Sequence, residues 1–562
     1  MSRDKGPLNK KTKRRVYSAF TFCLIMYSIL MYRLVDIQVL KGEEYQTRVE
    51  NQNTVKYSKN SGRGVIYDRN NKPLTDIEKK QIILVSKEAL NNDANILNLI
   101  KDATNMTEIE IYKEFQEQTS SSMIEIETKY IDENKKLKLQ ENDIIVTEKT
   151  ERYSKDALLS HTIGHLKKDD NSGEMGIEKS MNDILSNSNE EYISVFKAGA
   201  SGNKQGLEVL KGSIKEVDES EEDRHIKLTI DSDIQKIVEG VVDEEENPTA
   251  VVISDVDTGE ILSMSSRPNF DQNNIEQYFS DKTSDDGVFI NRATKAIYSP
   301  ASTFKLVVLY AALENKAIDL DYTYNCTGSV QVGNGEEKLN CNKIDGHGIQ
   351  TLQQALSNSC NTAFYDIASK LGKDKIMEAA KALHLDEKVD IGIEEACREL
   401  PENIALNLLA IGQGNLGFTP LQINQMTQII ANNGTYTPLY MYDSVVDNNM
   451  NTIKTFKSSK EEEIISPYTL TIVKEMMKDV AIEGTAKDLS ELEGGCGVKT
   501  GTAQLKIKGE DVTNGLITGY YPADNPKYAI TIVVEGNLKE GVVINKSAVP
   551  IFKEICQKLN KK

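Results

Sequence analysis

A charge-free stretch lies near the N-terminus, at residues 16–32, and ends at Arg33. As a helix rising about 1.5 Å per residue it spans roughly 25 Å, the lower limit for crossing a bilayer, and residues 34–40 can extend it. Lys and Arg dominate residues 1–15, and such basic flanks stay in the cytoplasm. The pattern predicts a transmembrane anchor with a short cytoplasmic tail. A cleaved signal peptide is the alternative, although no small-x-small cleavage site follows the stretch.

The pattern changes at an acidic run, residues 218–223, which is typical of a solvated connection. Before this run, a strand pattern at 63–70 enters an Asn-Asn turn, and residues 85–150 mix helical spacing with short β runs. This alternation predicts an elongated α/β region with a small inserted subdomain. We place the boundary near residue 222, which gives a non-catalytic region at 33–221 and a second domain at 222–562.

In the second domain, strand patterns lie at both ends and helical spacing fills the middle from Ser302 onward. A final amphipathic helix is expected near Val549 to Leu559. The expected strands are at 226–230, 250–255, 260–265, 497–503, 516–521 and 528–535. This order predicts an α+β domain with one antiparallel sheet, helices on both faces and a helical subdomain.

Charge and cysteine content argue against a nucleic-acid-binding protein and against a disulfide-rich scaffold. The formal net charge of -19 argues against nucleic acid as a partner, because its phosphates would be repelled, and suits a body beside a cell surface. Seven cysteines are too few for a disulfide scaffold of this length, and the odd number leaves at least one unpaired within the chain.

Three short motifs occur in order along the second domain: Ser302-Thr303-Phe304-Lys305, Ser359-Cys360-Asn361 and Lys499-Thr500-Gly501-Thr502. Each motif alone is weak, since Ser-x-x-Lys also begins at Ser2, Ser194 and Ser201. Only the motif at Ser302 is followed by the other two at a suitable spacing. Order and spacing therefore select these residues as candidates for catalysis.

Ser302 needs a base, because an alcohol is a poor nucleophile at neutral pH. Pro300 precedes a helix-forming run, so Ser302 lies at a helix start and Lys305 returns to the same face one turn later. Apolar neighbours predict a buried helix, in which a poorly solvated lysine favours its neutral form and can accept the serine proton. Without the other motifs, a capping serine and a surface lysine would be the preferred interpretation.

The second and third motifs offer polar groups for a substrate. Ser359-Cys360-Asn361 interrupts a helical pattern and by itself indicates a cap or a turn. In the third motif Gly501 lies within a strand pattern, and close approach of a substrate backbone is a use for it. Lys499 and the neighbouring hydroxyls can bind a carboxylate.

Together the motifs resemble the active-site boxes of the penicillin-recognising serine acyl-transferases. One departure is Ala301, which occupies a position where a glycine usually precedes the serine; the change is small enough that acylation is still expected. Further stretches similar to this family are Ser266 to Asp271, Asn291 to Ala293, Gly412 to Gly414, Thr419 to Gln422 and Gly519 to Ala523, and 63–70 and 173–185 resemble pedestal motifs of class B penicillin-binding proteins.

The resemblance implies a membrane-anchored D,D-transpeptidase that cross-links peptidoglycan stem peptides through an acyl-enzyme on Ser302 and is inhibited by β-lactams. It assigns a proton relay to Ser359 and the substrate amide to Asn361. It assigns the substrate carboxylate to Lys499, Thr500, Gly501 and Thr502, and the oxyanion hole to the backbone N–H groups of Ser302 and Thr502. D-Ala-D-Ala stem peptides and β-lactams are then the ligands, and a SEDS-family glycosyltransferase in the membrane is the implied partner.

Other functions use the same boxes. A β-lactamase or a D,D-carboxypeptidase shares the chemistry, while a β-lactam sensor or an idle scaffold belongs to a different class. The expected anchor and long pedestal argue against a secreted β-lactamase, and the intact boxes argue against a scaffold. We therefore expect a single-pass protein of the bacterial cell membrane with its catalytic domain outside.

Four candidate metal ligands lie between the first box and the end of the second: Cys326, Cys341, His347 and Cys360. Three thiolates and an imidazole are a normal tetrahedral set for structural Zn²⁺, and some class B proteins resemble this chain in having zinc at corresponding positions. A Cys326–Cys341 disulfide and unlinked thiols are the alternatives, with Asp345 as a reserve ligand. Zinc would fix the loop of the second box, whereas acyl transfer itself needs no cofactor.

Overall fold

The structure is a computed structural model of the 562-residue chain. It describes residues 10–41, 54–118, 123–128, 130–142, 144–186, 190–197, 209–219, 223–280, 287–331, 338–456, 461–507, 509–539, 542–544 and 547–562. The chain divides into two compact units: unit 1 comprises 1–60, 79–150 and 190–219, and unit 2 comprises 61–78, 151–189 and 220–562. Two stretches that precede residue 222 therefore belong to the unit that holds the three boxes.

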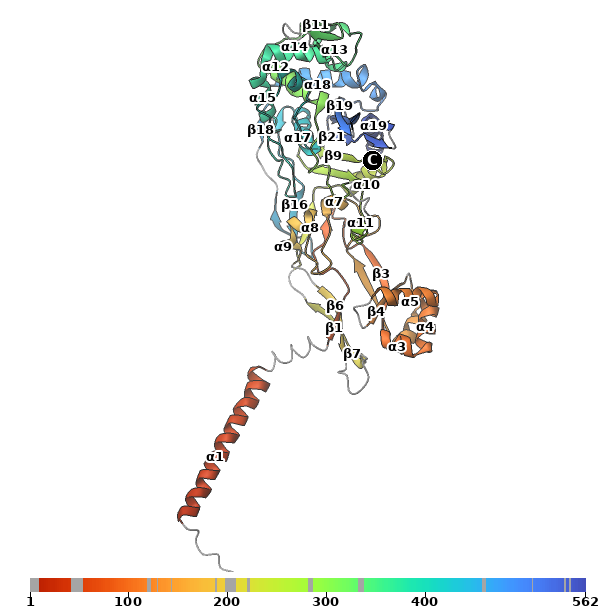
Figure 1. The fold of residues 1–562 in the computed structure, drawn as a ribbon, viewed down its shortest axis with the longest axis vertical. Helices are drawn as coiled ribbons and strands as arrows, with labels where there is room; N and C mark the ends of the chain where they lie inside the picture. Colours follow the sequence, from red (N-terminus) through yellow and green to blue (C-terminus); the bar gives the residue numbers. More distant parts are fainter. Residues whose placement is uncertain are drawn as a thin grey trace, which may run out of the picture. The chain divides into compact units, whose positions relative to one another are not determined.

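The N-terminal helix α1 (Lys10–Val35) contains the expected anchor and continues into a π-helical turn, Asp36–Leu40 (Figure 1). Within the span Lys13–Gln38, an 18-residue window has a mean hydropathy of 1.6, and none of that window is buried against the protein. Its length and composition fit a single-pass membrane anchor.

Unit 1 contains two three-stranded sheets and a group of helices. One sheet has the order β1 (Thr54–Ser58), β6 (Glu190–Lys197) and β7 (Val209–Glu219), and the other has the order β4 (Met123–Thr128), β3 (Glu78–Ser86) and β5 (Ile145–Glu151). The helices are α3 (Lys87–Asn92), α4 (Ala94–Thr104), α5 (Glu108–Glu117) and α6 (Glu133–Gln140). Their apolar faces share a core with the second sheet that includes Ile83, Ile100 and Ile124. This is the small α/β subdomain expected at 85–150.

Unit 2 is built on a five-stranded antiparallel sheet. Its order is β10 (Ile261–Arg267), β9 (Thr249–Asp255), β21 (Tyr528–Val534), β20 (Glu510–Tyr521) and β19 (Gly497–Ile507). Every residue of β21 is buried, which requires cover on both faces. Helix α17 (Pro420–Ala431) covers one face, and α10 (Ser232–Val242) with α19 (Val549–Leu559) covers the other (Figure 1). The α+β architecture predicted from the sequence is confirmed, but the strand expected at 226–230 does not belong to this sheet.

A helical part of unit 2 packs beside the edge strand β19. Residues 305–313 of α12 (Lys305–Glu314) are all buried, as its apolar sequence predicts. Around it lie α13 (Leu352–Ser357), α14 (Asn361–Leu371), α15 (Lys373–Ala382), α16 (Leu406–Ala410) and α18 (Pro467–Ile482). Residues 323–351 form a segment that we call the cysteine-rich segment. Its short strands pair as β11 (Thr323–Cys326) with β14 (Gly348–Thr351) and as β12 (Ser329–Gln331) with β13 (Lys338–Asn340).

The second sheet of unit 2 takes one strand from the N-terminal region. Its order is β17 (Thr452–Thr455), β16 (Tyr442–Val446), β8 (His225–Leu228) and β2 (Ile66–Tyr67), with β2 parallel to β8. The short helices α7 (Ser160–Ile163), α8 (Gly176–Ser180) and α9 (Asn182–Leu185) belong to the same part of unit 2. One apolar core joins Ile66, Leu159 and Ile177 to Ile226 and Leu439.

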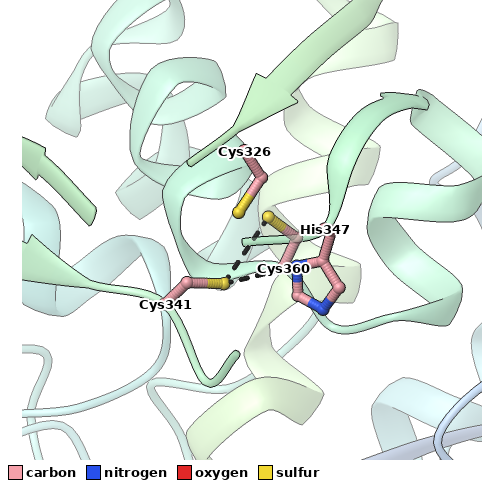
Figure 2. A group of neighbouring side chains, drawn as sticks. All are labelled: Cys326, Cys341, His347 and Cys360. Atoms are coloured by element: carbon pink, nitrogen blue, oxygen red, sulfur yellow. Dashed lines mark hydrogen bonds between the residues drawn. The ribbon is translucent and has the colours of Figure 1, made fainter. Parts of the chain in front are cut away.

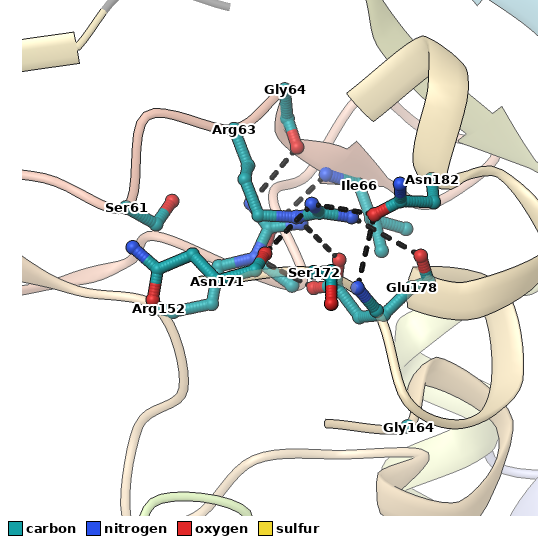
Figure 3. A network of polar contacts seen from close by, with 12 residues as sticks. Ser61, Arg63, Gly64, Ile66, Arg152, Gly164, Asn171, Ser172, Glu178 and Asn182 are labelled. Carbon is teal, nitrogen blue, oxygen red and sulfur yellow. Dashed lines mark hydrogen bonds and ion pairs between the residues drawn. The ribbon is translucent and has the colours of Figure 1, made fainter. Parts of the chain in front are cut away.

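A buried ionic network joins the N-terminal stretches of unit 2 (Figure 3). Glu178, with a fully buried side chain, accepts from Arg63 Nε at 2.9 Å and from Arg152 Nε at 2.7 Å. Arg63 also donates to Asn182 Oδ1 at 2.9 Å, and Arg152 pairs with Asp76. Glu178 therefore contacts both buried guanidinium groups and Asp76 adds a second carboxylate, which ties together segments far apart in the sequence.

Candidate active site

Ser302 lies in a 3-10 turn, Ala301–Phe304, that leads directly into α12. Ala301 has a φ of 46°, in the left-handed region that favours glycine. Its N–H donates to the carbonyl of Gly412 at 2.9 Å. A Cβ on Gly412 would lie 2.2 Å from the Ala301 oxygen, so this contact requires glycine at 412. The loop at Gly412 thus holds the turn that presents Ser302.

Lys305 is fully buried one turn after Ser302. Its Nζ donates to the carbonyl oxygen of Ser359 at 2.7 Å, to Ser359 Oγ at 3.2 Å and to Asn361 Oδ1 at 2.7 Å. Burial lowers the pKa of Lys305 to about 7, because the charged form is poorly solvated. Among the described residues no hydrogen bond joins Lys305 to the hydroxyl of Ser302; the amine faces the second box instead. Such contacts are often long before a substrate binds.

The second box lies between α13 and α14. Ser359 has a φ of 52°, which is uncommon for a residue other than glycine, and Asn361 begins α14. Ser359 is 6% exposed and Asn361 half-buried, and both line the cavity that contains Ser302. The polar run that interrupts the helical pattern is therefore a strained turn. It directs the side chains of Ser359 and Asn361 toward Lys305 Nζ.

The third box lies on β19. Lys499 is fully buried, and its Nζ donates to Ser359 Oγ at 3.1 Å and to the Thr500 carbonyl at 3.1 Å. Burial, followed by the positive charge of Lys305, holds the pKa of Lys499 well below its usual range. The two lysines thus meet at one hydroxyl group.

Gly501 brings β19 close to the nucleophile turn. A Cβ at this position would lie 3.0 Å from the Pro300 carbonyl oxygen and 3.3 Å from Thr303 Cγ2. Close approach of a substrate backbone is the use expected for this glycine from the sequence. The structure adds a second use, which is the packing of the strand against the turn that carries Ser302.

The three boxes line one cavity of about 750 Å³. Several other residues that line it were not selected from the sequence: Asn340, Asn342, Tyr365, Thr485, Gln504 and Ser547. Thr485 Oγ1 lies 2.6 Å from Thr500 Oγ1, and its N–H donates to the Ser357 carbonyl at 3.1 Å. Gly484, before it, allows this close approach, since a Cβ there would lie 2.5 Å from the Ser357 oxygen.

The four candidate metal ligands converge beside the second box. Figure 2 shows Cys326, Cys341, His347 and Cys360 pointing toward a common centre, and their ligand atoms all lie within 4.8 Å of one another. The Cys341 and Cys360 sulfurs are 3.7 Å apart, and Cys341 Sγ is 3.5 Å from His347 Nδ1. All seven cysteines are free, so the Cys326–Cys341 disulfide is not formed in this structure. The Cys₃His set is therefore assembled without a disulfide.

These separations test whether the cluster fits a tetrahedral metal. Zn–S bonds of about 2.3 Å and Zn–N bonds of about 2.0 Å place tetrahedral ligands about 3.8 Å (S to S) and 3.5 Å (S to N) apart. The two separations found agree with these values. The donor set and the burial of its three thiols also suit the ion.

The fold and the three boxes define an active-site serine transpeptidase domain on a non-catalytic region. Residues 249–557, more than half of the chain, match the family described as "Penicillin binding protein transpeptidase domain". Residues 58–217 match "Penicillin-binding Protein dimerisation domain". The chain belongs to the penicillin-binding proteins, with the two-domain composition of class B.

Curated relatives and solved structures agree with this assignment. The chain is 27% identical to stage V sporulation protein D of Bacillus subtilis, over 94% of this chain and 82% of that protein. It is 25% identical to peptidoglycan D,D-transpeptidase MrdA of Escherichia coli K12, over 93% and 91% of the two chains. The fold is similar to that of penicillin-binding protein PBP2 from Helicobacter pylori, with a TM-score of 0.67, 21% identity and coverage of 90% of this chain and 99% of that one.

Proposed function

We propose that this protein is a peptidoglycan D,D-transpeptidase that acts through an acyl-enzyme on Ser302. The observation that carries the proposal is the convergence of the three boxes on one cavity, with buried Lys305 and Lys499 both donating to Ser359 Oγ. The names of the relatives, D,D-transpeptidases among them, support the same chemistry.

In the first half-reaction, Ser302 Oγ attacks the carbonyl of the penultimate D-Ala of a donor stem peptide. Lys305 in its neutral form takes the serine proton, and Ser359 relays a proton to the departing D-Ala amine. The backbone N–H groups of Ser302 and Thr502 stabilise the oxyanion, and losing one such donor typically costs about 3 kcal/mol of transition-state stabilisation.

Substrate recognition falls to the third box. Lys499 with the hydroxyls of Thr500 and Thr502 binds the C-terminal carboxylate, and Asn361 holds the substrate amide. In the second half-reaction, an amine of a neighbouring stem peptide attacks the ester on Ser302 and forms the cross-link. A β-lactam acylates the same serine, and its ester persists.

The anchor helix α1 fits a single membrane span, with the basic N-terminal flank in the cytoplasm and both units outside the cell. Glycan polymerisation then belongs to a partner, and we propose a SEDS-family glycosyltransferase in the membrane. A complex of Helicobacter pylori PBP2 with MreC is a precedent for protein partners among proteins of this fold.

Cys326, Cys341, His347 and Cys360 would hold a structural Zn²⁺. The ion would link the segment that carries Cys360 to the segments of the other three ligands. Cys360 is the neighbour of both Ser359 and Asn361, and the ion would take no part in acyl transfer. Bound zinc would therefore order the second box.

The test is to incubate the detergent-solubilised full chain with a fluorescent penicillin and to follow the adduct over time. A label that persists for many minutes and is absent in Ser302→Ala supports a transpeptidase. Rapid loss of the label points to a β-lactamase. An unlabelled wild-type protein, or a label retained in Ser302→Ala, overturns the assignment of Ser302.

A further inference from the structure

We propose that Asn342 is a positioning residue for the second box, because it holds the strained peptide that precedes Ser359. The inference deepens the proposed function and rests on it, since Ser359 matters as a relay only in acyl transfer. The residue lies in the cysteine-rich segment, between Cys341 and His347, and has no role in the three boxes.

The backbone at Ser359 needs support from its surroundings. Its φ of 52° is a sparsely populated conformation that persists only where neighbouring groups enforce it. The N–H of Ser359 donates to the Leu356 carbonyl at 3.0 Å, and the Ser359 carbonyl accepts from Lys305 Nζ at 2.7 Å. These contacts fix one side of the turn.

The other side is held by two residues of the cysteine-rich segment. Asn342 Nδ2 donates to the carbonyl oxygen of Asn358 at 3.2 Å. Asn358 Nδ2 donates to Oε1 of Gln350, which is 2% exposed, at 3.2 Å. The peptide between Asn358 and Ser359 is thus held at its oxygen by Asn342 and at its N–H by Leu356, so it cannot rotate without breaking a hydrogen bond.

The consequence falls on the hydroxyl of Ser359. This oxygen accepts from Lys305 at 3.2 Å and from Lys499 at 3.1 Å, and rotation of the preceding peptide would move it away from both amines. Loss of the Asn342 contact should therefore slow the acylation step. Asn342 also lines the cavity, and a direct contact with substrate would instead change affinity.

The experiment measures penicillin acylation of the full chain in detergent, with the limiting rate constant at saturating drug separated from the apparent dissociation constant. The test variant is Asn342→Ala. The matched controls are Lys343→Ala and Ile344→Ala, two exposed neighbours in the same loop, of which Ile344 is 84% exposed. Zinc content and the fraction of chains that can be labelled are measured on each preparation.

We expect Asn342→Ala to lower the limiting rate constant about threefold to tenfold, the size of one net hydrogen bond, with affinity, zinc content and labelled fraction unchanged. In a Ser359→Ala background the same substitution should have no further effect, because residues that act through one group are not additive. A merely structural role would not produce this pattern.

An unchanged rate constant, a change confined to affinity, a full additive effect in the Ser359→Ala background, or a fall in rate matched by an equal loss of zinc would each overturn the proposal. Failure of the proposed function looks different, since it would show in the wild-type protein itself, as no label or a rapidly lost one, or as a label retained in Ser302→Ala.

Discussion

Lys499 Nζ donates a hydrogen bond of 3.1 Å to the hydroxyl oxygen of Ser359. The same oxygen accepts from the candidate base Lys305 at 3.2 Å, so one hydroxyl connects the proton acceptor to the carboxylate site. We expect Ser359→Ala to lower the rate of acylation by fluorescent penicillin about 100-fold or more, the usual loss when a proton-transfer group is removed. Ser357→Ala, in the preceding helix, is the control and should retain most of the rate. Equal rates for both variants would contradict a relay at Ser359.

Acylation should depend on pH through Lys305. Burial depresses the pKa of this lysine to about 7, and only the neutral amine can accept the serine proton. The second-order rate constant should therefore rise about tenfold per pH unit below pH 7 and level off above it. Stopped-flow acylation between pH 5 and 9 measures the profile. A rate that stays flat down to pH 5 would rule out neutral Lys305 as the base.

Gly412 should tolerate no side chain. In Gly412→Ala the new Cβ would lie 2.2 Å from the Ala301 oxygen, and the φ of +67° is itself unfavourable for alanine. The turn that carries Ser302 must shift, and we expect acylation to fall at least about tenfold, since small displacements of reacting groups are costly.

Gly240 provides the matched control. It lies in α10, and a Cβ there would meet nothing within 4 Å. Gly240→Ala should leave acylation unchanged and raise the free energy of unfolding by about 0.5–1 kcal/mol, because alanine is the better helix former. If both variants acylate at the wild-type rate, the loop at 412 does not position the nucleophile.

Zinc should be present at about one ion per chain in protein purified without chelators. Removing it, or replacing a ligand in Cys326→Ser, should lower the melting temperature. It should also slow acylation, because Cys360 is both a candidate ligand and the middle residue of the second box. Metal analysis and thermal unfolding test this. Less than about 0.2 zinc per chain would reject the site.

The buried Glu178 should contribute far more to stability than an exposed carboxylate with two similar partners. Glu178→Gln removes the charge that contacts both Arg63 and Arg152, of which Arg152 keeps Asp76, and we expect a loss of about 3–5 kcal/mol in the free energy of unfolding. Glu394 pairs with Lys179 and Lys295, and all three side chains are about half exposed. Glu394→Gln removes these two ion pairs and should lower the free energy of unfolding by about 1 kcal/mol or less. Denaturant unfolding compares the two; equal losses would contradict the distinction.

The site was largely predictable because its chemistry is carried by short motifs in a set order. Ser302, Ser359 and Lys499 could be selected from residue types and spacing alone; the fold places Ser302 and Ser359 in one cavity and joins Lys499 to Ser359 by a hydrogen bond. The Cys₃His set was predictable for the same reason, since few residue types can bind a metal. Thr485 was not, because a threonine after a helix has many uses and only the fold brings it to Thr500.

The fold was predictable where the pattern is local. Helix α19 has the bounds expected from its amphipathic spacing, and the strands of the central sheet lie at or beside the expected positions. The division into units was not visible in the sequence. Strand β2 pairs with β8, and Arg63 with Glu178, across more than a hundred residues, and no local pattern encodes such pairs.

The interleaving of the chain between the two units affects how the enzyme can be dissected. A fragment that starts at residue 223 would lose β2, and the edge of β8 beside it would be open to pairing with other molecules. It would also bare the apolar surface that Ile66, Leu159 and Ile177 now cover. Aggregation of a truncated catalytic piece would then reflect missing partners, and soluble protein for crystallography or drug screening should retain residues 61–78 and 151–189.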